Sequence, residues 1–210
     1  MVYICCIAKR FNLMVGTFNP SWNPHYDFQN PGNLREIAEV EGYKLDMDKA
    51  DYTTGQMVDS PWGSNQVIEA KQENGIDVCI KLITVKPGFM LSLQRHRGRE
   101  ELWEVKEGIL TVILDGKRYD VPAGQSISMH RGAVHCMINS SDAPVTVMET
   151  QSGICREKDN VRLIDFNNRP TYPLTTEVEY LSGLLYAQIQ NDHATRYGFN
   201  NFPHEALLKI

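Results

Sequence analysis

The sequence predicts an all-β barrel or sandwich with a helical extension at each end. Between Trp62 and Asp165, short runs rich in Val, Ile, Leu and Thr recur at close intervals, with turn-forming pairs between them. Many short strands with regular turns and no intervening helix are typical of an antiparallel sandwich or barrel. We therefore divide the chain into an N-terminal extension (1–60), a barrel (61–165) and a C-terminal helical extension (166–210).

The barrel region contains the runs that we expect to form strands. They are 78–85, 89–94, 101–106, 109–114, 117–121, 125–129, 134–138, 145–151 and 161–164. Asp115-Gly116 lies between two apolar runs and is the strongest hairpin signal in the chain, because both residue types tolerate the positive φ angles of a tight turn.

The two extensions each carry one helix signal. In the N-terminal extension a helix is expected from Asn33, with Glu36 three residues on as its capping partner. In the C-terminal extension Thr176 and Glu179 form a predicted capping box. The apolar stripe that we expect this second helix to bury is Leu181, Leu184, Leu185 and Ile189.

Composition excludes several classes of protein. The 210 residues are 42% hydrophobic and 22% charged, which is typical of a globular chain with a real core. A net charge of -5 argues against a nucleic-acid partner, and no apolar run approaches the roughly 20 residues that span a bilayer. The five cysteines are odd in number and form no CxxC pair, so we expect free thiols and a cytoplasmic protein.

Residues with metal-binding chemistry cluster in two blocks of the barrel region. The first block contains Gly88, Gln94, His96, Glu101 and Gly108, and the second contains Gly124, His130, Gly132, His135 and Asn139. Because side chains alternate faces along a strand, Gln94 and His96 are expected to point the same way. With Glu101 and His135 from neighbouring strands, they would bring an amide oxygen, a carboxylate and two imidazoles to one point.

A divalent metal ion suits this set of side chains. Four buried polar groups without a cation would cost several kcal/mol unless each were hydrogen-bonded, which is the alternative interpretation. One carboxylate and three neutral ligands would leave a bound divalent ion with a net charge of about +1. We expect one ion at Gln94, His96, Glu101 and His135, with zinc as the first candidate and Mn, Fe, Co or Ni as others.

The two blocks resemble the paired motifs of the cupin superfamily, in which the position of Gln94 usually holds His and that of His130 holds Pro. The neighbouring residues are similar to the cupin domain of type II mannose-6-phosphate isomerases, a family that itself carries Gln at the first position. The agreement includes Pro61-Trp62-Gly63, Lys81, Pro87-Gly88, Leu91-Ser92-Leu93-Gln94, Arg99, Trp103, Gly132-Ala133-Val134-His135, Glu149-Thr150-Gln151-Ser152-Gly153, Val161-Arg162 and Asp165…Arg169. The resemblance covers roughly 61–169 and implies a cupin-type barrel, also called a double-stranded β-helix or jelly roll.

The sequence departs from that family at several points. The family's histidine-rich stretch after His96 is here Arg97-Gly98, and the nucleotidyltransferase domain that often precedes this cupin, with its Gly-rich phosphate loop, is absent from the sequence. We therefore expect a stand-alone cupin that does not make GDP-mannose. The substrate that the resemblance implies is a sugar or sugar phosphate.

The resemblance implies metal-dependent aldose–ketose isomerisation through an enediolate. Such chemistry needs a base close to the substrate carbon. Strand parity places Lys81 and Glu149 inside the barrel, either as catalytic groups or as a structural ion pair. Arg99 and Arg162 match family positions, and arginine is suited to holding an anion. We expect both to contact the substrate and Arg162 also to take part in catalysis; the alternative is that they are solvated surface residues.

Two rival functions and one assembly are also consistent with these residues. His96, Glu101 and His135 alone form the two-His-one-carboxylate set of non-haem iron oxygenases. A non-catalytic sugar-binding or regulatory cupin would bind a ligand without turnover. The cupin resemblance also implies a homodimer, because a partner often covers the open sheet edges of such barrels.

Overall fold

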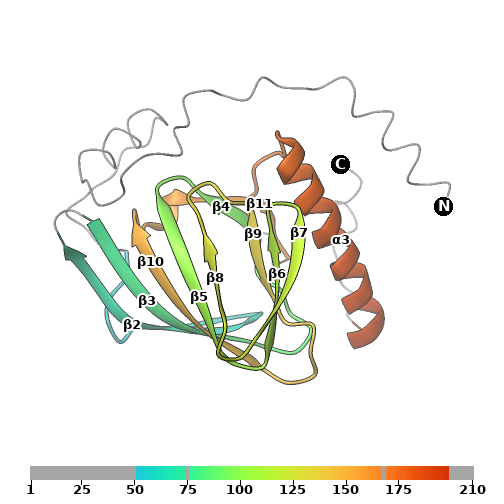
Figure 1. The fold of residues 1–210 in the computed structure, drawn as a ribbon, viewed down its shortest axis with the longest axis horizontal. Coiled ribbons are helices and arrows are strands. Elements are labelled where there is room, and N and C mark those ends of the chain that lie inside the picture. The colour runs from blue at the N-terminus through green and yellow to red at the C-terminus, as the bar shows by residue number, and fades with distance from the viewer. Residues whose placement is uncertain (1–50, 74–75, 167–168, 199–210) are drawn as a thin grey trace.

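The computed structural model describes residues 51–73, 76–166 and 169–198, which form two facing β-sheets with one long helix against the second sheet (Figure 1). The predicted all-β class is confirmed. From β3 onward the chain passes repeatedly between the two sheets, which is how a jelly roll is built. The helix expected from Asn33 lies outside the described residues.

The first sheet has six antiparallel strands. In order across the sheet they are β1 (Met57–Ser60), β2 (Gly63–Glu73), β3 (Ile76–Val85), β10 (Val145–Gly153), β5 (Arg99–Glu107) and β8 (Ser126–Met129). β1 and β2 were not expected from the sequence, and β1 lies inside the range assigned to the N-terminal extension. β1 is the edge strand and β2 pairs with it, and neither sequence shows the apolar alternation of a strand with one buried face.

The second sheet has five strands. In order they are β11 (Asn160–Ile164), β4 (Leu93–His96), β9 (His135–Ile138), β6 (Ile109–Leu114) and β7 (Lys117–Pro122). The strand expected at 89–94 is regular only from Leu93. Before it, Met90 forms an isolated bridge with Ile138, so this stretch follows β9 without joining the regular ladder.

The predicted hairpin at Asp115-Gly116 is confirmed. The φ angles of Asp115 and Gly116 are 48° and 75°, the pair of left-handed residues that a type I′ turn requires. The Asp115 carboxylate stabilises the turn further, accepting a hydrogen bond from the Val134 amide at 2.9 Å and facing His130 Nε2 at 2.9 Å.

The helix α3 (Glu177–Tyr197) begins with the predicted capping box and packs on the second sheet. The predicted buried stripe is wrong at Leu181 and Leu184, which are 47% and 39% exposed. The packed face lies one residue further along, through Ser182 and Tyr186, because Ser182 is small enough to approach the hairpin. Its Oγ accepts a hydrogen bond from the Gly116 amide at 2.9 Å.

One histidine outside the candidate site and three cysteines are buried in the described part of the chain. His193 lies in the buried face of α3, and its two ring nitrogens are 2.8 Å from Gly88 O and 3.0 Å from Ser140 Oγ. Among the described residues, Cys79, Cys136 and Cys155 are buried free thiols, as expected of small apolar side chains. Among the described residues, no helix is both long enough and apolar enough to cross a membrane.

The barrel interior is divided along its strands into an apolar end and a polar end. On β10 the inward residues are Val145 and Val147, followed by Glu149 and Gln151. On β3 the corresponding change is from Val85 and Ile83 to Lys81, and on β5 from Val105 and Trp103 to Glu101. The apolar end forms a continuous hydrophobic core, and the buried polar groups are gathered at the other end of the barrel.

The contact between α3 and the hairpin gives a stability prediction with an internal control. Gly116→Ala forces a Cβ to within 3.0 Å of the Leu181 Cβ at a φ of 75°, whereas Gly124→Ala, at a φ of 84°, meets nothing within 4 Å. The left-handed backbone should lower the free energy of unfolding of both alanine variants by about 1 kcal/mol. Gly116→Ala should lose roughly 1 kcal/mol more because of the clash with Leu181. Urea denaturation measures this difference, and equal losses would contradict the docking of α3.

Candidate metal centre

The polar end of the barrel is built by residues that face each other in register on three neighbouring strands. Glu149 of β10 lies opposite Lys81 of β3 and opposite Trp103 of β5. Gln151, two residues further on the same face, lies opposite Glu101. The second sheet supplies His96 and His135 from the ends of β4 and β9 that face this point.

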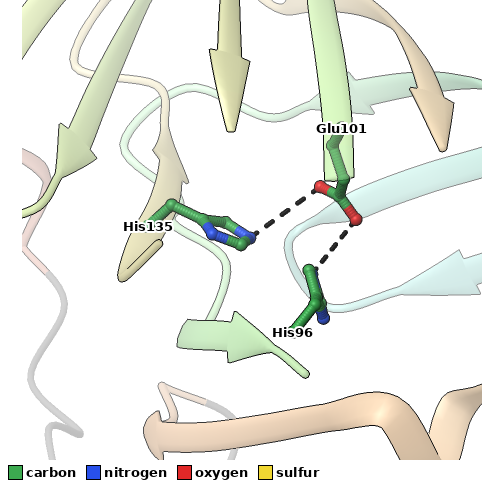
Figure 2. A group of neighbouring side chains, drawn as sticks. All are labelled: His96, Glu101 and His135. Atoms are coloured by element: carbon green, nitrogen blue, oxygen red, sulfur yellow. Dashed lines mark ion pairs between the residues drawn. The ribbon is translucent and has the colours of Figure 1, made fainter. Parts of the chain in front are cut away.

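His96, Glu101 and His135 converge inside the barrel (Figure 2). Their ligand atoms lie within 4.8 Å of one another, and all three side chains are buried. His96 Nε2 is 3.1 Å from Glu101 Oε1, and His135 Nε2 is 3.8 Å from Glu101 Oε2. His96 and Glu101 come from consecutive strands, whereas His135 joins them from a distant part of the sequence.

His135 is oriented as a metal-binding histidine would be. Its Nδ1–H donates to the Ala133 carbonyl oxygen at 2.8 Å, which leaves Nε2 with a lone pair directed at the centre. This Nε2 is buried and has no hydrogen-bond partner among the described residues. A buried acceptor without a partner is uncommon in proteins, and a cation in the centre would supply one.

The protonation states of the cluster also suit metal ligands. Burial lowers the pKa of His96 to about 3, with a further contribution from the Arg99 charge, and burial lowers the pKa of His135 as well. Burial would raise the pKa of Glu101, but the attraction of His96 and Arg99 outweighs it and holds that pKa well below its usual value. The cluster therefore presents two neutral imidazoles and one carboxylate near neutral pH.

Hydrogen bonds from the surrounding barrel hold the Glu101 carboxylate in place. Trp103 Nε1 donates to Oε2 at 3.0 Å, and Gln151 Nε2 donates to Oε1 at 2.9 Å. Arg99, which is only 4% exposed, donates from Nε to Oε1 at 2.9 Å. Arg99 is thus part of the buried centre, and the solvated-surface alternative for it is wrong.

Gln94 adjoins the centre with its amide oxygen turned to other partners. That oxygen accepts hydrogen bonds from Ser92 Oγ at 2.8 Å and from Asn160 Nδ2 at 2.9 Å, while Nε2 lies 3.5 Å from His96 Nε2. The expected shared side of Gln94 and His96 is therefore observed. The Gln94 amide oxygen, which was expected to be a metal ligand, points away from the centre and its Nε2 faces His96. A ligand role for Gln94 stays a prediction.

Lys81 and Glu149 form a second buried group beside the centre. Lys81 Nζ lies 3.8 Å from Glu149 Oε2, and both side chains are buried, as strand parity predicts. Gln151 Nε2 also donates to Glu149 Oε2 at 2.8 Å, so one amide connects Glu149 with Glu101. The Tyr52 ring covers Lys81, with Nζ 3.7 Å from the ring centroid.

The pKa of Glu149 is raised to about 8. Burial is the largest cause, and the nearby negative charge of Glu101 adds to it, while Lys81 and Arg99 oppose the shift. A carboxyl that titrates near neutral pH can accept and return a proton, which is the property required of a general base.

Arg162 lies at the margin of this region. It is in register with Gln94 on the neighbouring strand, and its guanidinium makes an ion pair with the exposed Glu157. It is half-buried, whereas Glu157 is largely in solvent. Its assigned roles in catalysis and substrate binding stay predictions.

Sequence reasoning missed three residues of the site. Gln151 follows Glu149 at the spacing of two that places both side chains inside the barrel, so parity could have indicated it. Asp159 accepts hydrogen bonds from the amides of Arg97 and Gly98 and so shapes the turn between His96 and Glu101. No local pattern marks Asp159 or Tyr52, because each acts through a contact between distant segments.

One protein family matches more than half of the chain. The family described as mannose-6-phosphate isomerase C-terminal matches residues 47–165. This range includes the three converging residues together with Lys81 and Glu149. It also includes β1 and β2, which the sequence patterns did not indicate.

Curated relatives match part of the chain. A mannose-1-phosphate guanylyltransferase of Escherichia coli K12 is 36% identical over 122 residues, which is 58% of this chain and 24% of that protein. The alginate biosynthesis protein AlgA of Pseudomonas aeruginosa is 36% identical over 114 residues, 54% of this chain and 23% of AlgA. The chain therefore spans about a quarter of the length of these relatives.

Solved structures match at low sequence identity. A sugar phosphate isomerase of the cupin superfamily from Silicibacter pomeroyi matches with a TM-score of 0.37 and 20% identity over 52% of this chain and 74% of that chain. The capsular polysaccharide assembling protein CapF of Staphylococcus aureus matches with a TM-score of 0.47 and 15% identity over 57% of this chain and 34% of that chain.

The centre predicts stoichiometric metal binding that depends on His135. Metal-free protein titrated with Zn²⁺ should bind one ion per chain, and His135→Ala should bind at least tenfold more weakly because it removes a ligand aimed at the centre. His193→Ala is the matched control, since His193 is also buried but bonds Gly88 O and Ser140 Oγ. Isothermal titration calorimetry measures both. Equal weakening in the two variants would show that the effect is not specific to the centre.

The raised pKa of Glu149 predicts a pH-dependent stability of the metal-free protein. The folded state holds the Glu149 proton up to about pH 8, whereas an unperturbed carboxyl releases it near 4.5. Stability relative to the Glu149→Gln variant should therefore fall as pH rises between these values, because the folded state binds more protons than the unfolded state there. Urea midpoints at pH 5, 6.5 and 8 test this sign, and a rising difference would contradict it.

Proposed function

The chain belongs to the mannose-6-phosphate isomerase C-terminal family, and from this premise we propose that it is a metal-dependent aldose–ketose isomerase. The proposed substrates are mannose 6-phosphate and fructose 6-phosphate or a related sugar. The observation that carries the proposal is the placement of two groups in one buried interior. One is the cluster of His96, Glu101 and His135, and the other is the Lys81–Glu149 pair, connected to it through Gln151.

His96, Glu101 and His135 are the proposed holders of the metal ion, with Gln94 as a further candidate. Two imidazoles and a carboxylate are accepted by zinc and by Mn, Fe, Co and Ni. A bound divalent ion would supply Lewis acidity toward the oxygens of the sugar. The part of the reaction that the protein's own side chains perform is proton transfer.

Glu149 is the proposed base. Its carboxylate removes the proton from the carbon next to the substrate carbonyl, and the C–H electron pair becomes the carbon–carbon double bond of the enediolate. The same carboxyl returns the proton to the adjacent carbon, which had been the carbonyl carbon, and a carbonyl forms at the other position. A pKa of about 8 supports both halves of this exchange.

Lys81 and Arg162 are the proposed supporting groups. The Lys81 ammonium, held beside Glu149 and under the Tyr52 ring, donates a proton to the oxygen that gains charge and takes one from the neighbouring hydroxyl. Arg162 pairs with an exposed carboxylate, Glu157, which an anionic group of the substrate can replace. Arg99 contacts the centre directly, and its position inside the barrel favours a role there over contact with a distant phosphate.

A second candidate function rests on the composition of the cluster. Two histidines and one carboxylate are also the ligand set of non-haem iron oxygenases. Oxygen uptake by the Fe²⁺-loaded protein distinguishes the two, because isomerisation consumes no oxygen.

Turnover is the direct test of the proposed activity. Protein loaded in turn with Zn²⁺, Mn²⁺ and Co²⁺ should interconvert mannose 6-phosphate and fructose 6-phosphate, or act on one of a panel of free aldoses. In D₂O the product should carry deuterium at the reacting carbon, because the proton held by the Glu149 carboxyl exchanges with solvent before it is returned. Ligand binding without turnover or exchange on any of these sugars would favour a non-catalytic cupin.

Substitution of Glu149 should separate catalysis from binding. Glu149→Gln keeps the shape of the side chain but removes the base, so kcat should fall by about 10²- to 10⁴-fold while Zn²⁺ affinity stays within a few-fold. Glu104→Gln is the control, since Glu104 points outward from the adjacent strand into solvent. Steady-state kinetics on the sugar that the turnover assay identifies measure both variants. An unchanged kcat in Glu149→Gln would show that Glu149 is not the base.

A further inference from the structure

Arg99 occupies an unusual place for a residue beside a candidate metal centre. Its guanidinium is buried, with Nε 2.9 Å from Glu101 Oε1 and NH2 3.1 Å from His96 Nε2. Arginine only donates hydrogen bonds, so in this contact His96 Nε2 is the acceptor; the same nitrogen also lies 3.1 Å from Glu101 Oε1. Arg99 therefore holds two of the atoms through which His96 and Glu101 would bind a metal ion.

A metal ion and this guanidinium cannot share His96 Nε2. An imidazole nitrogen has one lone pair, and a metal ion would take it at a distance of about 2.1 Å. Both competitors are also cations, and in a buried site their repulsion is screened far less than in water. Binding of a divalent ion through His96 Nε2 therefore requires the Arg99 guanidinium to release that nitrogen.

The structure contains a second position for the displaced guanidinium. Arg99 NH1 already donates to the Arg156 carbonyl oxygen at 3.2 Å and lies 3.9 Å from Asp159 Oδ2. Asp159 is buried and is the last residue of the 3-10 helix Glu157–Asp159, directly before β11. Arg99 can keep these contacts while it lets go of His96, so its charge need not be left unpaired.

We infer that Arg99 is a built-in counter-cation of the metal-free centre, which competes with a divalent ion for His96 Nε2 and Glu101 Oε1 and must release them before the ion binds. In the metal-free protein it compensates the buried charge of Glu101 and keeps the ligands in place. Metal uptake is then an exchange of one cation for another. The inference rests on the proposed metal binding, but not on isomerase activity.

Cobalt titration of metal-free variants tests the competition. Arg99→Leu removes the guanidinium without adding a metal ligand, so it should bind Co²⁺ at least tenfold more tightly than the unsubstituted protein, by calorimetry or by the visible Co²⁺ spectrum. Arg156→Leu is the matched control, because Arg156 is also a buried arginine but pairs with Asp77, and its Co²⁺ affinity should stay within about threefold.

The outcomes separate this inference from the metal centre itself. If the unsubstituted protein binds Co²⁺ and Arg99→Leu binds it equally or more weakly, the competition is refuted and the centre stands. If no variant binds Co²⁺, the metal centre fails and the inference fails with it.

A second measurement covers the case in which Arg99→Leu does not fold. In ¹⁵N NMR spectra of the unsubstituted protein, the Arg99 Nε–H signal is identified by its loss in Arg99→Lys. On saturation with Zn²⁺ it should shift and exchange with solvent at least tenfold faster, since its bond to Glu101 is broken. An unchanged signal at saturating Zn²⁺ would overturn the inference.

Discussion

The negative charge of Glu101 inside the barrel is the constraint to which the rest of the site responds. A carboxylate removed from water costs several kcal/mol unless hydrogen bonds and a cation compensate it. Trp103, Gln151 and Arg99 all donate to its two oxygens, and His96 and His135 lie on its open side. Each of these partners is itself buried, so the position of one carboxylate fixes the orientation of the whole centre.

The fold can carry such a cluster because its stability comes from elsewhere. The same strands that present polar groups at one end of the barrel bury a continuous hydrophobic core at the other, and α3 seals a second apolar core against the outer face of the five-stranded sheet. Apolar side chains buried a few residues away on the same strands thus offset the unfavourable free energy of the charged interior.

Features that depend on local geometry could be predicted from the sequence, and those that depend on distant contacts could not. The Asp115-Gly116 turn is set by the φ preferences of two residues, and the inward positions of Lys81 and Glu149 follow from the alternation of a strand. The buried face of α3 was misplaced at Leu181, because a small serine decides how closely the helix approaches the sheet. The sequence left Arg99 open between a substrate contact and a solvated surface residue, because its burial depends on distant segments such as the Arg156 carbonyl to which it donates.

The central claim is that His96, Glu101 and His135 enclose one divalent ion, and the X-ray absorption spectrum of the zinc-loaded protein tests it most directly. The account predicts a first shell of nitrogen and oxygen at about 2.0–2.1 Å, with the outer-shell scattering of two imidazole rings and no sulfur. A sulfur shell near 2.3 Å, or a spectrum without imidazole scattering, would place the ion elsewhere and contradict the account.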